Sequence, residues 1–168
     1  FPLFFAVLAV STGCASILNA RLVMRFGMRP LSLWAALFAG GLSILFFGLA
    51  LGWNGHPPLP ALMIYFFVVF FSIGLLFGNL NALAMEPLGH IAGVGSAVVG
   101  GLSTIIALLL GLVVGQAYNG TIVPLVTGFA VLNLTAFLVM RWADLRRADD
   151  HLSREDRLGL MNIENLDR

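Results

Sequence analysis

Glu86 is the residue of this sequence that most invites a chemical interpretation, because it is the only acidic side chain among the first 143 residues. It lies in the stretch MEPLGH, directly before Pro87, with long apolar segments on both sides. An ionisable group inside a membrane is costly and usually functional. Glu86 is therefore either a buried proton-carrying site or part of a polar turn between two apolar helices.

Uncharged polar side chains recur on single faces of the apolar segments, at intervals of three, four or seven residues. Residues at these spacings share one side of an α-helix. The candidates are Thr12, Ser16 and Asn19 in one segment, Tyr65, Ser72 and Asn79 in another, and Ser103, seven residues after Ser96, in a third. Two interpretations stay open: these groups form a weakly polar cavity wall for a small apolar or amphipathic solute, or they join neighbouring helices by hydrogen bonds.

The sequence contains no pattern typical of an enzyme, so we expect a protein without catalytic residues, cofactor or metal. His56, His90 and His151 are far apart and lack metal-ligand spacing. Cys14 is the only cysteine, which excludes an intramolecular disulfide. Nucleic acid is not an expected partner either, because the arginines lie at the edges of apolar segments rather than in a basic stripe.

Composition predicts a membrane protein that needs the lipid bilayer as its solvent. The chain is 60% hydrophobic and 10% charged, with mean hydropathy +0.98, whereas soluble domains average about 25% charged residues. Five apolar segments are long enough to cross a bilayer as helices. They form a predicted transmembrane bundle over residues 1–143, with helices at about 3–24, 30–51, 61–85, 91–117 and 122–142.

Residues 144–168 differ sharply from the bundle, because 13 of the last 28 residues of the chain are charged. This segment is predicted to be a charged cytoplasmic tail. A solvated, partly disordered terminus is favoured over a short amphipathic helix on the membrane surface.

Arginine placement predicts the orientation of the bundle. The first loop carries Arg21, Arg25 and Arg29, and further arginines follow the fifth segment, whereas the loops around Asn54 and Asn119 carry no charge. Basic residues accumulate on the cytoplasmic side of membranes. The first loop, the Glu86 loop and the C-terminus are therefore expected to be cytoplasmic, and the start of the chain to lie outside.

Small residues follow two rows along the fourth segment and predict close packing of that helix. Small residues four positions apart allow helix backbones to approach each other in lipid. The first row comprises Gly89, Gly93, Ala97 and Gly101, and the second comprises Ser103, Ala107, Gly111 and Gly115. Together they predict a tight bundle rather than loosely associated helices.

Two stretches resemble the major facilitator superfamily of transporters. NARLVMRFGMRP, residues 19–30, is similar to the second-half copy of its cytoplasmic loop motif, with Leu22, Arg25, Gly27 and Arg29 at matching positions. Ala20 and Met24 occupy the motif's glycine and aspartate positions, so a charge relay through that aspartate is absent from this copy. The second stretch, from Gly78 to Gly101, is similar to the region of the tenth and eleventh helices in Bcr/CflA-type drug-resistance transporters.

In that second stretch the pattern A-G-x-x-S-A is carried by Ala92, Gly93, Ser96 and Ala97, and YNGTIVPL before the last segment resembles the same family. The resemblance implies helices eight to twelve of a twelve-helix fold, a C-terminal half lacking its first helix. It also implies proton-coupled efflux of drugs or small metabolites across a bacterial inner membrane, with the remaining helices upstream in the same transporter. The alternative function is a small five-helix structural or accessory membrane protein.

The predicted topology places Glu86 at the cytoplasmic end of the third segment, where a carboxylate is hydrated. The favoured interpretation is therefore a turn residue that pairs with Arg21, Arg25 or Arg29 on the same membrane face. Such a pair is expected to act as a latch on a cytoplasmic gate.

Overall fold

The computed structural model describes the backbone of residues 2–166 and the side chains of residues 2–147. Every regular element in this part of the chain is helical, as the sequence predicts. The elements are α1 (Pro2–Phe26), α2 (Met28–Gly52), α3 (Leu59–Met85), the 3-10 helix η1 (Glu86–Ile91), α4 (Ala92–Gln116) and α5 (Val123–Leu166).

Four helical stretches of the described chain are long and apolar enough to cross a membrane: Pro2–Phe26, Met28–Gly52, Leu59–Gln116 and Val123–Arg147. The chain therefore has the architecture of a helical membrane protein. The third stretch combines α3, η1 and α4 in 58 residues, where the sequence predicts two separate segments.

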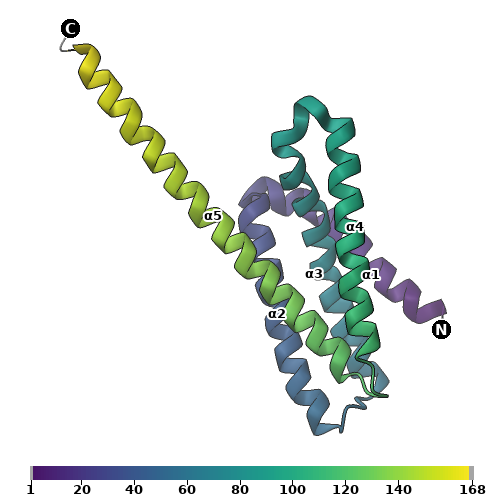
Figure 1. Ribbon diagram of the computed structural model, residues 1–168. Helices are drawn as coiled ribbons and strands as arrows, with labels where there is room; N and C mark the ends of the chain where they lie inside the picture. The colour runs from purple at the N-terminus through teal and green to yellow at the C-terminus, as the bar shows by residue number, and fades with distance from the viewer. Residues whose placement is uncertain (1, 167–168) are drawn as a thin grey trace.

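α3 and α4 nevertheless fold back on each other (Figure 1). α3 begins shortly after Gly55, whose carbonyl accepts the N–H of Ile122 at 3.1 Å, and α4 ends six residues before Ile122. The start of α3 and the end of α4 therefore lie at the same end of the bundle. η1 makes the turn at the other end, where the sequence predicts the MEPLGH turn.

The helix boundaries follow from glycine and proline residues at the predicted breaks. Gly27 separates α1 from α2 with φ at 82°, a left-handed conformation that glycine adopts without steric cost. Pro58 precedes α3, and Pro60 occupies its first turn, where a missing N–H costs nothing.

The bundle is built around α2 and α3. α2 packs mainly on α5 and α3, and α1 packs mainly on α3. An aromatic and aliphatic cluster joins α2, α3 and α5. The residues buried at its centre are Phe46, Tyr65, Val69 and Val126. The Phe46 and Tyr65 rings stack with centroids 4.3 Å apart.

α4 makes few contacts within this chain, so the close packing that its glycine rows predict is not seen there. Gly95 is the only buried residue that α4 contributes. A Cβ atom added to Gly89, Gly93, Gly101, Gly111 or Gly115 would meet no other atom within 4 Å. Ala97 is also exposed. Spacing identifies which helix face is small but not whether the chain itself supplies a neighbour for that face.

α5 is much longer than the predicted fifth segment and projects beyond the other helices (Figure 1). It continues to Leu166 through residues 144–166, for which a partly disordered terminus was the favoured expectation. The segment contains no proline and many good helix formers, including arginine and leucine, so the helix can continue after the apolar part ends. Side chains beyond Arg147 lie outside the described residues.

Candidate functional site

α1 and α3 run in the same direction and touch closely along one line of contact. The Ser11 hydroxyl donates a hydrogen bond to the carbonyl of Phe67. Further along, Gly74 lies against α1 so closely that a Cβ atom there would be 2.8 Å from the Cβ of Ala15. Glycine is needed at position 74 because the backbones approach too closely for a side chain.

Asn19 and Asn79 form a reciprocal pair at the next contact along these helices. The Asn19 amide donates to Asn79 Oδ1 at 2.8 Å, and the Asn79 amide donates to Asn19 Oδ1 at 2.9 Å. Asn79 is 2% exposed, whereas Asn19 is partly exposed. This pair supports the helix-joining interpretation for these two residues.

A pocket of about 350 Å³ opens beside the same interface. Its α1 side is formed by Thr12, Ser16 and Asn19, the polar face that the sequence predicts. Its α3 side is formed by Ile73, Gly74, Phe77 and Gly78. Thr12 and Ile73 lie within two residues of the middle of their helices, so the pocket reaches the middle of the bundle.

Four predicted cavity residues do not line this pocket: Tyr65, Ser72, Asn79 and Ser103. The Tyr65 hydroxyl lies 2.9 Å from the Ser43 hydroxyl of α2, and the Ser72 hydroxyl donates to the Val68 carbonyl at 3.1 Å. Ser103 is exposed on α4.

The reason is which face of α3 borders the pocket. Tyr65, Ser72 and Asn79 are each only 2–3% exposed, so they share one buried face of α3, which packs against neighbouring helices. The pocket is bordered by an adjacent face, formed by Ile73, Gly74, Phe77 and Gly78. α1 crosses α3 obliquely and covers only part of its length (Figure 1).

At the end of the bundle that contains η1, Arg29 joins three elements; we call this the arginine end. One guanidinium nitrogen lies 3.3 Å from Glu86 Oε2, and another lies 3.4 Å from Asp144 Oδ1 of α5. The predicted pairing of Glu86 with a first-loop arginine is thus confirmed for Arg29. Arg21 and Arg25 are exposed and make no ion pair within residues 2–147.

Asp144 is the member of this cluster that sequence reasoning missed, because it was assigned to the tail. It is 115 residues from Arg29, and no local spacing connects the two. The only available signal was the predicted alternation of the helices, which brings the end of the last segment to the same membrane face as the first loop.

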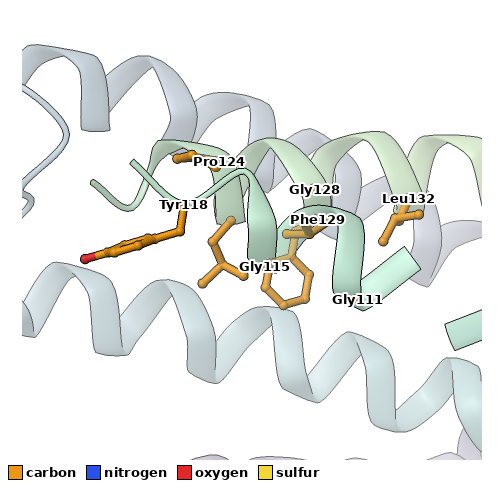
Figure 2. Close-up of a pocket in the computed structure, with 9 residues that line it drawn as sticks. Gly111, Gly115, Tyr118, Pro124, Gly128, Phe129 and Leu132 are labelled. Carbon is orange, nitrogen blue, oxygen red and sulfur yellow. The ribbon is translucent and has the colours of Figure 1, made fainter. Parts of the chain in front are cut away.

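An apolar pocket of about 450 Å³ lies between α4 and α5 at the opposite end of the bundle. Figure 2 shows Tyr118 and Pro124 at one end of this pocket and Leu132 at the other. Gly111 and Gly115 line it, so two of the predicted packing glycines border a space instead of a helix. The helices touch nearby, where Val114 lies against Gly128.

Among the described residues, no three His, Cys, Asp or Glu side chains come together as a metal site. No family model matches the chain, and no curated protein or solved structure is significantly similar to it. The pocket between α1 and α3 and the arginine end are therefore the features of the chain that bear on its function.

Proposed function

We propose that this chain is part of a secondary active transporter of the major facilitator superfamily, of the Bcr/CflA drug-resistance type. Its activity would be proton-coupled efflux of drugs or small metabolites across a bacterial inner membrane by alternating access. The observation that carries the proposal is the pocket between α1 and α3, which has three polar side chains on one wall and reaches the middle of the bundle. Secondary transporters bind their solutes near the bilayer midplane.

Aromatic residues at both ends of the bundle support a membrane position that puts the pocket at this depth. Exposed Trp34 and Trp142 lie near the arginine end, and exposed Trp53 and Tyr118 lie near the other end. Such residues prefer the membrane–water interface. Trp34 lies on α2, and Trp53 caps the end of this helix nineteen residues later. This separation corresponds to about 29 Å of helix, close to a hydrocarbon core of about 30 Å.

Five membrane crossings follow from the same dimensions. A straight helix of 58 residues would be about 87 Å long, far more than one crossing needs. Because α3 and α4 each run between the two ends of the bundle, we assign them one crossing apiece. The five helices would then correspond to helices eight to twelve of the superfamily fold.

The chemistry of the pocket fits an amphipathic solute. Thr12 and Ser16 offer hydroxyl groups and Asn19 an amide, opposite the apolar side chains of Ile73 and Phe77. No charged residue lines the pocket. We propose that it contributes one wall of the central cavity, and that α1 and α4 face further helices of the same transporter.

The arginine end would act as the cytoplasmic gate. The excess of arginine there supports a cytoplasmic position. Arg29 connects α2 with η1 and α5 through Glu86 and Asp144, so opening this end would require one or both contacts to break. The groups are 32–56% exposed, and such pairs contribute only about 0–1 kcal/mol, which suits a latch that has to open repeatedly.

Binding of an amphipathic cationic dye such as rhodamine 6G to the chain in lipid nanodiscs tests this proposal. We expect saturable binding by fluorescence polarisation. Ser16→Leu fills the pocket and should weaken binding by about tenfold, equivalent to about 1.4 kcal/mol. Ile17→Leu is the control, because Ile17 is 73% exposed and lies outside the pocket.

Dye that only partitions into lipid, or equal binding by the two variants, would contradict the cavity assignment. That outcome would favour a structural or accessory membrane protein.

A further inference from the structure

A groove of about 510 Å³ separates α2 from α5 near the arginine end; we call it the α2–α5 groove. Its charged part is formed by Arg29, Arg141 and Asp144, and its apolar part includes Trp34, Leu37 and Phe137. It is distinct from the α1–α3 pocket and shares no residue with it.

The two arginines of the groove differ in their partners. Arg29 is bonded to two carboxylates, Asp144 at 3.4 Å within the groove and Glu86 at 3.3 Å outside it. Arg141 makes no ion pair within residues 2–147. The guanidinium of Arg141 is therefore the positive charge of the groove that an anion can neutralise.

The depth of the groove restricts the kind of anion. Trp34 is 69% exposed, as expected for a ring at the membrane–water interface. Leu37 and Phe137 continue the groove along both helices toward the middle of the bundle. A ligand with an anionic head at the arginines and a hydrocarbon chain along these side chains would fill both parts.

We propose that the α2–α5 groove binds an anionic phospholipid of the surrounding leaflet. The headgroup phosphate accepts hydrogen bonds from Arg141 and from the N–H groups of Arg29 that its carboxylate partners leave unused, since a guanidinium has five donors. One acyl chain lies against Leu37 and Phe137. Basic pockets between helices on the cytoplasmic side of membranes suit anionic headgroups. This inference is independent of whether the chain takes part in transport.

Trp34 provides a fluorescent reporter inside the groove. The full chain carrying Trp53→Phe and Trp142→Phe keeps Trp34 as its only tryptophan. Reconstituted into phosphatidylcholine vesicles, it would be titrated with phosphatidylglycerol bearing dibrominated acyl chains, which quench a nearby indole. We expect about fivefold tighter association than for dibrominated phosphatidylcholine, the usual effect of one basic residue near an anionic lipid.

Variants with equal changes in charge test the role of the groove. Arg141→Gln should abolish most of the preference for phosphatidylglycerol. Arg146→Gln removes the same charge from the same helix but outside the groove, over the Trp142 ring in the unaltered chain, and should keep the preference. Asp144→Asn removes the competing carboxylate and should increase the preference for phosphatidylglycerol, which gives a second test of opposite sign.

Four results would overturn the proposal. Equal quenching by phosphatidylglycerol and phosphatidylcholine would show that no anionic lipid is selected. Equal losses of the preference for phosphatidylglycerol in Arg141→Gln and Arg146→Gln would show that it arises from a diffuse surface charge. Equal quenching by dibrominated phosphatidylethanolamine would show that net negative charge is not recognised. Displacement of the lipid by millimolar inorganic phosphate would indicate a site for the free anion, whereas no displacement is expected for a lipid site.

Discussion

Replacing Asn19 or Asn79 by leucine should destabilise the bundle unequally. Asn19→Leu leaves the amide of Asn79 without its partner, and Asn79 is 2% exposed. A buried unsatisfied polar group costs about 1–3 kcal/mol, so we expect a loss of about 2 kcal/mol. Asn79→Leu leaves Asn19 partly exposed beside the pocket, where water can replace the lost partner. Its expected cost is about 1 kcal/mol, within the range of interhelical hydrogen bonds in membranes.

The double variant Asn19→Leu/Asn79→Leu separates the interaction from these single effects. It removes both amides together, so its loss of stability should be smaller than the sum of the two single losses by about 1–2 kcal/mol. The free energy of unfolding would be measured in mixed micelles by titration with sodium dodecyl sulfate. Additive single losses, or a larger loss for Asn79→Leu than for Asn19→Leu, would refute the reasoning.

Three further predictions concern other contacts. Gly74→Val should lower the free energy of unfolding by about 1–3 kcal/mol, because a side chain there overpacks against Ala15. Gly13→Val should not, because a Cβ atom at Gly13 meets no other atom within 4 Å. Equal unfolding free energies for the two variants would contradict the close approach of α1 and α3. Arg29→Gln should cost less than about 1 kcal/mol in the same unfolding assay, because its ion pairs are partly exposed; a larger loss would contradict the latch. In a Cys14→Ser background, cysteines at positions 28 and 119 should react with impermeant maleimide from opposite membrane faces, the first from the cytoplasm; labelling from one face would contradict the orientation.

Local periodicity predicted the helices and one wall of the pocket. Thr12, Ser16 and Asn19 share a helix face by their spacing alone, and this face does line a pocket. The helix breaks were also predictable, because glycine and proline residues mark them in the sequence. These features depend on residues close together in the chain.

Partner choice between helices was not predictable from the same patterns. Tyr65 is polar and lies on a predicted face, but its hydroxyl meets Ser43 of α2 rather than a cavity. The glycine rows of α4 are small on the expected side, but α4 has few neighbours in this chain. Both outcomes depend on the tilt and neighbours of a helix, which periodicity does not specify.

Glu86 illustrates both sides of this limit. Its position between two apolar segments predicted a hydrated turn residue with an arginine partner, and Arg29 is that partner. The second carboxylate on Arg29, Asp144, comes from a helix that is distant in sequence. An ion pair between two loops was predicted, but a contact that also includes α5 was not.

The accessibility of the α1–α3 pocket to water tests the central claim most directly. Ser16→Cys and Ile17→Cys, each in a Cys14→Ser background, place a thiol at nearly the same depth, inside and outside the pocket. If the pocket is a solute cavity, a membrane-impermeant maleimide will label Ser16→Cys, and rhodamine 6G will slow that reaction, while Ile17→Cys stays unreactive in lipid. Equal reactivity at the two positions, or a Ser16→Cys thiol that does not react, would contradict the account.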